Sequence, residues 1–104
     1  MDSGLSPATV AGIRQVLACF PQVEKAVLYG SRARGNSKPG SDIDLTLFGS
    51  GINGDVLADI ANALDDLLLP IVVDLSAYSM LDNQELIDHI DRVGVVFYNQ
   101  AEPW

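Results

Sequence analysis

Residues 28–48 read Leu-Tyr-Gly-Ser-Arg-Ala-Arg-Gly-Asn-Ser-Lys-Pro-Gly-Ser-Asp-Ile-Asp-Leu-Thr-Leu-Phe, and the organisation expected for the chain follows from them. The apolar run that ends at Tyr29 is typical of a buried strand. A Gly-Ser pair then breaks that strand, and the chain resumes as a second strand over residues 42–48. Because successive side chains of a strand point to opposite faces, we expect Asp42 and Asp44 on one face.

Two acids of this stretch and a third further along the chain predict a metal site. Asp42 and Asp44 repel each other, which costs stability unless a cation lies nearby. Asp74 interrupts the apolar run 71–75, where a buried unpaired carboxylate is also costly. If the strands expected at 42–48 and 71–75 are neighbours, the three carboxylates lie close together. Mg²⁺ prefers such hard oxygen ligands. We therefore expect Asp42, Asp44 and Asp74 to be catalytic residues and ligands of two Mg²⁺ ions, an arrangement suited to phosphoryl transfer.

The Gly-Ser pair predicts a nucleotide-binding turn. Gly30 allows a phosphate to approach the backbone, and Ser31 offers a hydroxyl and an N–H to phosphate oxygens. Arg32 and Arg34 follow, and we expect both to contribute to nucleotide binding. Pairing with nearby acids and simple solvation are the alternatives for these two arginines.

The remaining patterns predict an α/β fold with a small mixed β-sheet covered by helices. We expect one domain over residues 1–104, with a frayed tail at 99–104. The expected elements are a helix from the Ser6 cap to before Pro21, strands at 22–29 and 42–48, helical turns at 31–36, a helix over 55–69, a strand at 71–75, a helix with Asp82 and Glu85 in a capping box and Gly94 at its end, and a strand at 95–98.

Composition narrows the class of protein. The formal net charge of −8 over 104 residues repels phosphate backbones, so nucleic acid is not expected as a partner. The acidic surface either keeps the protein soluble or complements a basic protein partner. Apolar runs are too short to span a membrane, and the cytoplasm is the expected compartment. Cys19 is expected to be a buried, inert thiol, and His89 to lie on a helix surface or half-buried without a role as ligand or base.

The spacing of the motif resembles that of a known family. Gly30-Ser31, ten residues and then Asp42-x-Asp44 is similar to the signature of the DNA polymerase β-like nucleotidyltransferases. The fuller segments 30–35 and 41–45 resemble the minimal branch of that superfamily, the MNT domain proteins. The resemblance implies that the Gly-Ser turn holds the β- and γ-phosphates of an NTP. It also implies that Asp42 and Asp44 bind the metals, while Asp74 completes the acceptor-side metal site and helps to activate the attacking hydroxyl.

The resemblance also implies a partner and a reaction. Minimal members pair with a small helical HEPN protein, and the nucleotidyltransferase acts as an antitoxin that attaches AMP to a tyrosine of the toxin. We therefore expect Mg²⁺-dependent transfer of NMP, specifically AMP from ATP, to a hydroxyl of a HEPN-type protein. Two alternatives stay open. One is a non-catalytic antitoxin that neutralises its partner by docking, and the other is transfer to a small molecule such as an aminoglycoside at a homo-oligomer interface.

Overall fold

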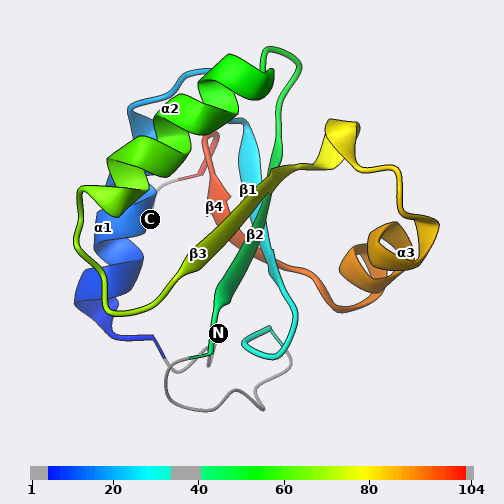
Figure 1. The fold of residues 1–104 in the computed structure, drawn as a ribbon, viewed down its shortest axis with the longest axis horizontal. Coiled ribbons are helices and arrows are strands. Elements are labelled where there is room, and N and C mark those ends of the chain that lie inside the picture. The colour runs from blue at the N-terminus through cyan, green and yellow to red at the C-terminus, as the bar shows by residue number, and fades with distance from the viewer. Residues whose placement is uncertain (1–4, 34–40, 103–104) are drawn as a thin grey trace.

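The computed structural model describes residues 5–33 and 41–102. Within these ranges the chain forms, in order, α1 (Pro7–Ala18), β1 (Lys25–Tyr29), β2 (Ile43–Phe48), α2 (Gly54–Asp65), β3 (Val73–Ala77), the 3-10 helix η1 (Tyr78–Met80), α3 (Gln84–Val93) and β4 (Val95–Asn99). Figure 1 shows α1 and α2 on one side of the sheet and α3 on the other.

The strands form one mixed sheet in the order β3-β2-β1-β4. β1 is antiparallel to both β2 and β4, whereas β2 and β3 are parallel. A parallel pair needs a long crossover, and α2 provides it. The predicted α/β class and mixed sheet are confirmed, and the strands that carry Asp44 and Asp74 are neighbours.

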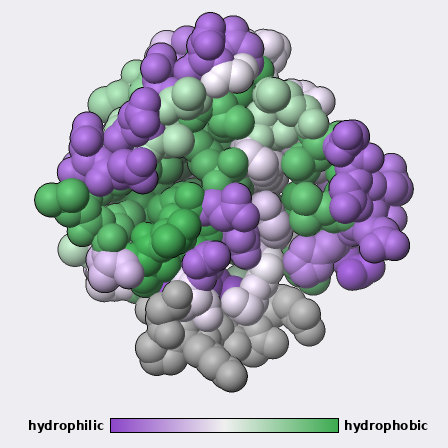
Figure 2. All heavy atoms as spheres, in the orientation of Figure 1, coloured by the Kyte–Doolittle hydropathy of each residue, from purple (hydrophilic) through white to green (hydrophobic). Residues whose placement is uncertain are grey.

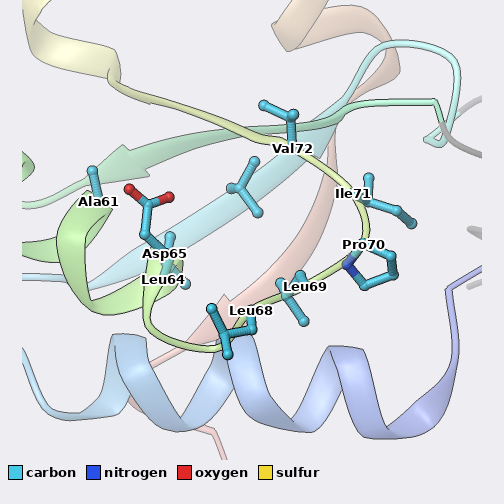
Figure 3. Close-up of a pocket in the computed structure, with 9 residues that line it drawn as sticks. Ala61, Leu64, Asp65, Leu68, Leu69, Pro70, Ile71 and Val72 are labelled. Carbon is cyan, nitrogen blue, oxygen red and sulfur yellow. The ribbon is translucent and has the colours of Figure 1, made fainter.

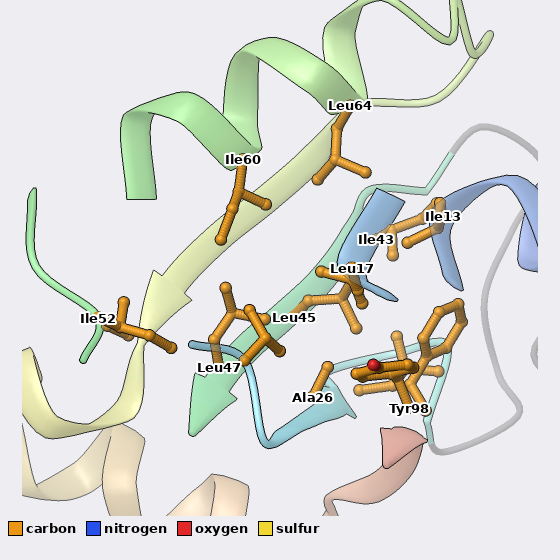
Figure 4. Packing of buried hydrophobic residues seen from close by; sticks show 14 residues of the cluster. Ile13, Leu17, Ala26, Ile43, Leu45, Leu47, Ile52, Ile60, Leu64 and Tyr98 are labelled. Carbon is orange, nitrogen blue, oxygen red and sulfur yellow. The ribbon is translucent and has the colours of Figure 1, made fainter. Parts of the chain in front are cut away.

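Most of the core lies between the sheet and the α1/α2 layer. Alternation along the strands sends one set of apolar side chains toward these two helices, where they pack against buried residues of both. Figure 4 shows this cluster, in which Ile13 and Leu17 come from α1, Ile60 and Leu64 from α2, and Ile43, Leu45 and Leu47 from β2. On the opposite face a smaller cluster joins Val27 and Tyr29 to Ile90 of α3. That face is covered only in part, which leaves room for polar groups.

The cap predicted from the sequence is correct for α1 and one residue too early for α3. The Ser6 hydroxyl accepts a hydrogen bond from the Thr9 N–H at 3.1 Å, which confirms the predicted cap of α1. The predicted cap of α3 at Asp82 is wrong. Asn83 is the cap, and its side-chain oxygen accepts from the Leu86 N–H at 3.2 Å. Glu85 then falls one position too early for the capping box, because that motif needs the acid three residues after the cap.

The connection between α2 and β3 differs from its prediction. The helix ends at Asp65 instead of continuing to Leu69, and the chain tightens through hydrogen bonds such as that from the Leu68 N–H to the Asp65 carbonyl. Leu68 then adopts a positive φ of 54°. Pro70 disfavours a helical residue before it, so the helix cannot resume. As a result β3 begins at Val73, two residues later than predicted.

Three further expectations are corrected. The first strand begins at Lys25 because Pro21 and Gln22 lie in a turn. Cys19 is exposed rather than buried, since it follows the last residue of α1. Fraying does not begin at residue 99, because Asn99 belongs to β4 and the Gln100 N–H donates to the Glu24 carbonyl at 2.9 Å. The helical turns expected over 34–36 and the end of the tail fall outside the described residues.

Among residues 5–33 and 41–102, no helix is both long and apolar enough to cross a bilayer.

Candidate active site

The sheet face toward α3 carries two rows of side chains across β1, β2 and β3; the first row is polar on all three strands, and the second is polar on β2 and β3 with Val27 on β1. In the first row Tyr29 of β1 pairs in register with Asp44 of β2, which pairs with Asp74 of β3. The second row lies one step along the strands and includes Thr46 and Ser76. Residues in register on neighbouring strands lie about 5 Å apart, so the first row brings two carboxylates side by side.

The pKa of Asp44 reflects this crowding. Its pKa is raised above the ordinary value, chiefly because burial disfavours the charged form, and next because Asp74 and then Asp42 add negative potential. His89 acts in the opposite direction and lowers the pKa of this carboxyl. The charged form of Asp44 is therefore less favoured than that of an ordinary aspartate, and a bound cation would relieve this cost.

Gly30 packs directly against the carboxylate of Asp44. Its φ of 78° lies in the region that favours glycine, and a Cβ built on it would overlap the Asp44 Oδ2 atom. The turn after β1 can therefore approach the acid only because residue 30 has no side chain. Ser31 follows at an exposed position, where its hydroxyl is accessible to a ligand.

The donor set fits Mg²⁺, although its side chains are not gathered around one point. Asp42 and Asp74 are exposed, and Asp42 lies two residues before Asp44, which places it on the same face by alternation. Among the residues that the structure describes, no three His, Cys, Asp or Glu side chains converge closely enough to hold an ion together. The backbone thus brings hard oxygen donors to one edge of one face, and their function as a three-ligand metal site stays a prediction.

Arg32 has a structural contact that the sequence did not indicate. Its side chain is only 2 % exposed, and its Nε donates to the Ser41 carbonyl at 2.9 Å. This hydrogen bond ties the turn after β1 to the residue just before Asp42 and so fixes the spacing of the motif in space. Phosphate binding by Arg32 stays a prediction beside this role. Arg34 lies outside the described residues.

His89 is half-buried, as predicted, and it lies beside the candidate site. Its ring meets the ring of Tyr29 edge-on, with 6.2 Å between the centroids. It also contributes positive potential at Asp44, so α3 places a histidine over the row of acids. The sequence spacing indicates this position, because His89 lies three residues after Leu86 and four before Val93 and therefore on the helix face that packs on the sheet.

Hydroxyl groups line the floor of the site. Tyr29 has a raised pKa, mainly from burial, while a hydrogen bond with the Ser76 side chain lowers it and the charges of Asp44 and Asp74 raise it further. Thr46 is fully buried, and its Oγ1 has no hydrogen-bond partner among the described residues. An unpaired buried hydroxyl costs about 1–3 kcal/mol, so the polar second row is not explained by stability alone.

The geometry therefore comprises paired carboxylates on neighbouring strands, a glycine turn packed against one of them, and a serine at the start of that turn. The chain matches the family described as Polymerase beta, Nucleotidyltransferase over residues 12–103. It belongs to that family. No curated protein matches the chain in sequence.

Solved structures share the fold with this chain. One is a toxin–antitoxin complex with AMP-PNP, with a TM-score of 0.71 and 20% identity over 88% of this chain and 74% of the other. A second is the tri-AMPylated Shewanella oneidensis HEPN toxin in complex with MNT antitoxin, with a TM-score of 0.66 and 18% identity over 88% and 71%. A third is a putative nucleotidyltransferase from Sulfolobus solfataricus, with a TM-score of 0.51 and 21% identity over 97% and 96%. At these identities the likeness concerns the fold, and in the complexes it is to the MNT antitoxins.

Proposed function

We propose that the protein transfers AMP from ATP to a hydroxyl of a HEPN-type protein and acts as the antitoxin of that partner. The observation that carries the proposal is the register of Asp44 with Asp74 on parallel strands, with Gly30 packed against Asp44. Among the described residues, burial, Asp74 and Asp42 raise the pKa of Asp44, and His89 lowers it. A cytoplasmic setting fits a reaction that consumes ATP.

In the proposed reaction, different residues of the chain bind the metal and the phosphates. Mg²⁺, held by Asp42, Asp44 and Asp74, would supply charge neutralisation for the triphosphate and the developing charge on the transferred group. The turn at Gly30 and Ser31 binds the β- and γ-phosphates through backbone N–H groups and the serine hydroxyl. Arg32 and Arg34 add positive charge near the same phosphates. Fixing the reactants in this way converts an encounter between two molecules into a reaction within one complex.

The transfer exchanges one bond to the α-phosphorus for another. The acceptor oxygen forms a bond to the α-phosphorus, and the bond from that phosphorus to the bridging oxygen on the β-phosphate breaks. Pyrophosphate leaves with the electron pair of the broken bond. The proton of the acceptor hydroxyl passes to the Asp74 carboxylate, which lies on the exposed edge strand where a protein acceptor can reach it.

The partner is proposed from likeness and charge together. Structures with the same fold include MNT antitoxins crystallised with HEPN toxins, one of which is AMPylated. The formal net charge of −8 suits a basic partner surface and speeds the encounter with it.

Labelled nucleotide tests this proposal. Purified protein, Mg²⁺ and ATP labelled at the α-phosphate are added to a lysate of the source organism, and ATP labelled at the γ-phosphate serves as the matched control. We expect one protein band labelled from the α-phosphate only, absent with the Asp42→Asn/Asp44→Asn variant. Labelling from the γ-phosphate would identify a kinase, and labelling that survives the double variant would remove the acids from the mechanism.

Docking without transfer is the second candidate. It is favoured by the lack of convergence of the acids within the described residues. Under this alternative the Asp44→Asn variant would neutralise its partner as well as the wild type does, whereas transfer predicts that neutralisation is lost.

A further inference from the structure

A hollow of about 360 Å³ opens at the sheet edge formed by β3, between the end of α2 and the start of that strand. Figure 3 shows Leu64, Leu69, Pro70 and Ile71 around it and Leu68 at its margin, while Val72 lines it from the backbone just before β3 and points its side chain to the other face of the sheet. Figure 2 shows a continuous apolar area over the same α2–β3 connection, beside hydrophilic residues. Contiguous exposed apolar surface of this kind marks sites of interaction.

Packing within the free protein does not explain why apolar residues occupy positions 68 and 72 beside the hollow. Leu68 is 87 % exposed and Val72 is 66 % exposed, the highest values among the large hydrophobic residues described. Leu68 also has its φ of 54° in the left-handed region, where Gly or Asn is under less strain. A leucine at this position is therefore unfavourable twice over in the free protein.

The apolar surface adjoins the acceptor side of the active site. The Val72 carbonyl accepts a hydrogen bond from the Ile43 N–H at 2.9 Å, which places Val72 beside the first residue of β2, the residue that follows Asp42. Val72 precedes Asp74 by two residues, so the two side chains share a face about 6–7 Å apart. In the proposed function, the Asp74 carboxylate accepts the proton of the attacking hydroxyl.

We propose that Leu68 and Val72 are the docking surface for the protein acceptor, which wraps around the edge of β3, so that one of its apolar side chains enters the hollow on the α1/α2 side while its hydroxyl reaches Asp74 on the side of α3. This inference rests on the proposed function. Asp65 lines the same hollow, and the chain as a whole is strongly acidic. The docking segment of the acceptor therefore carries basic residues around its apolar side chain, which is the chemistry of a basic protein surface and not of a second acidic copy of this chain.

The test compares matched surface variants. Leu68→Asn suits the positive φ and removes the apolar side chain, and Val72→Thr keeps the shape of valine. Val96→Thr is the control, because Val96 is 50 % exposed on β4, the opposite edge strand. The probe is the purified HEPN-type protein encoded by the same genome. Three quantities are measured: the KM for this acceptor in AMP transfer, its Kd without nucleotide, and the affinity for Mg²⁺-ATP.

We expect Leu68→Asn/Val72→Thr to raise the KM and the Kd for the acceptor at least about tenfold, with unchanged Mg²⁺-ATP affinity and an unchanged or higher melting temperature. Val96→Thr should change none of these values. If the wild type binds the acceptor but transfers nothing, the proposed function fails, and the Kd alone still decides the docking surface. Equal Kd values for wild type and the double variant would overturn the inference. So would a wild-type dimer that the double variant converts to a monomer, since a second copy would then cover the surface.

Discussion

At the scale of single residues, Gly30 is the position where local backbone and site chemistry depend on each other. Its positive φ and its contact with the Asp44 carboxylate both exclude a side chain. We expect Gly30→Ala to lower the free energy of unfolding by about 1–2 kcal/mol from the backbone alone, and to displace Asp44 as well. Chemical denaturation measures the first effect and Mg²⁺-ATP affinity the second. A variant with wild-type stability and affinity would show that this turn does not have the described conformation.

Asp44 should make the stability of the metal-free protein depend on pH. Because its pKa in the folded state is raised, the folded state binds a proton more tightly than the unfolded state. The contribution of Asp44 to stability is therefore present below the ordinary pKa of an aspartate and is lost as the pH rises through the raised value. We expect Asp44→Asn to be more stable than the wild type at pH 7 without metal, and this advantage to disappear as the pH falls to about 4.

Thermal melts across that range, in the presence of a chelator, measure the difference between the two proteins. Asp65→Asn is a suitable control, since Asp65 is exposed and is not among the groups that shift the pKa of Asp44. A wild type that is more stable than Asp44→Asn at pH 7 would mean that a positive group compensates the acid already.

The residues of the site could be predicted from sequence only where the periodicity of a strand determines them. The common face of Asp42 and Asp44 follows from the two-residue repeat. Placing Asp74 beside Asp44 also requires that β2 and β3 are neighbours, which the sequence alone could not establish. His89 and Tyr29 come together through the packing of α3 on β1, a contact between segments that no local pattern specifies.

At the scale of elements, the start of α3 distinguishes two adjacent capping residues. Asn83 caps the helix through its side-chain oxygen, whereas Asp82 has no such hydrogen bond with the first turn. We expect Asn83→Ala to lower the free energy of unfolding by about 1 kcal/mol. Asp82→Ala serves as the matched control and should change it by less than about 0.5 kcal/mol. Denaturation curves measure both changes in the free energy of unfolding. A larger loss from Asp82→Ala than from Asn83→Ala would show that Asp82 caps the helix.

Element types were predictable because hydrophobic periodicity is strong in this chain, while several boundaries were not. Asp82 and Asn83 have nearly equal preferences for the cap, so the choice between them depends on how α3 sits on the sheet. The apolar pattern of α2 continues to Leu69, although the helix ends at Asp65. Leu67 packs against the core cluster from a non-helical segment and Leu68 faces solvent, and periodicity cannot separate these cases from a continued helix.

At the scale of the whole molecule, ligand binding and folding should be linked through the acids. A non-hydrolysable ATP analogue with Mg²⁺ binds only the folded state, so at one hundred times its Kd it adds about 2.7 kcal/mol to the free energy of unfolding. We expect this gain for the wild type and its loss in the Asp42→Asn/Asp44→Asn variant. Melting temperatures with and without the ligand measure it. A gain of equal size in the double variant would place the nucleotide elsewhere.

The measurement that tests the transfer reaction most directly is the intact mass of a purified HEPN-type acceptor after incubation with this protein, Mg²⁺ and ATP. We predict that the acceptor gains the mass of one or more AMP groups on hydroxyl side chains. Asp74→Asn should slow this modification at least about 100-fold and leave Mg²⁺-ATP bound. An acceptor of unchanged mass with the wild-type protein, still bound and neutralised, would contradict the account and show that docking alone is the activity.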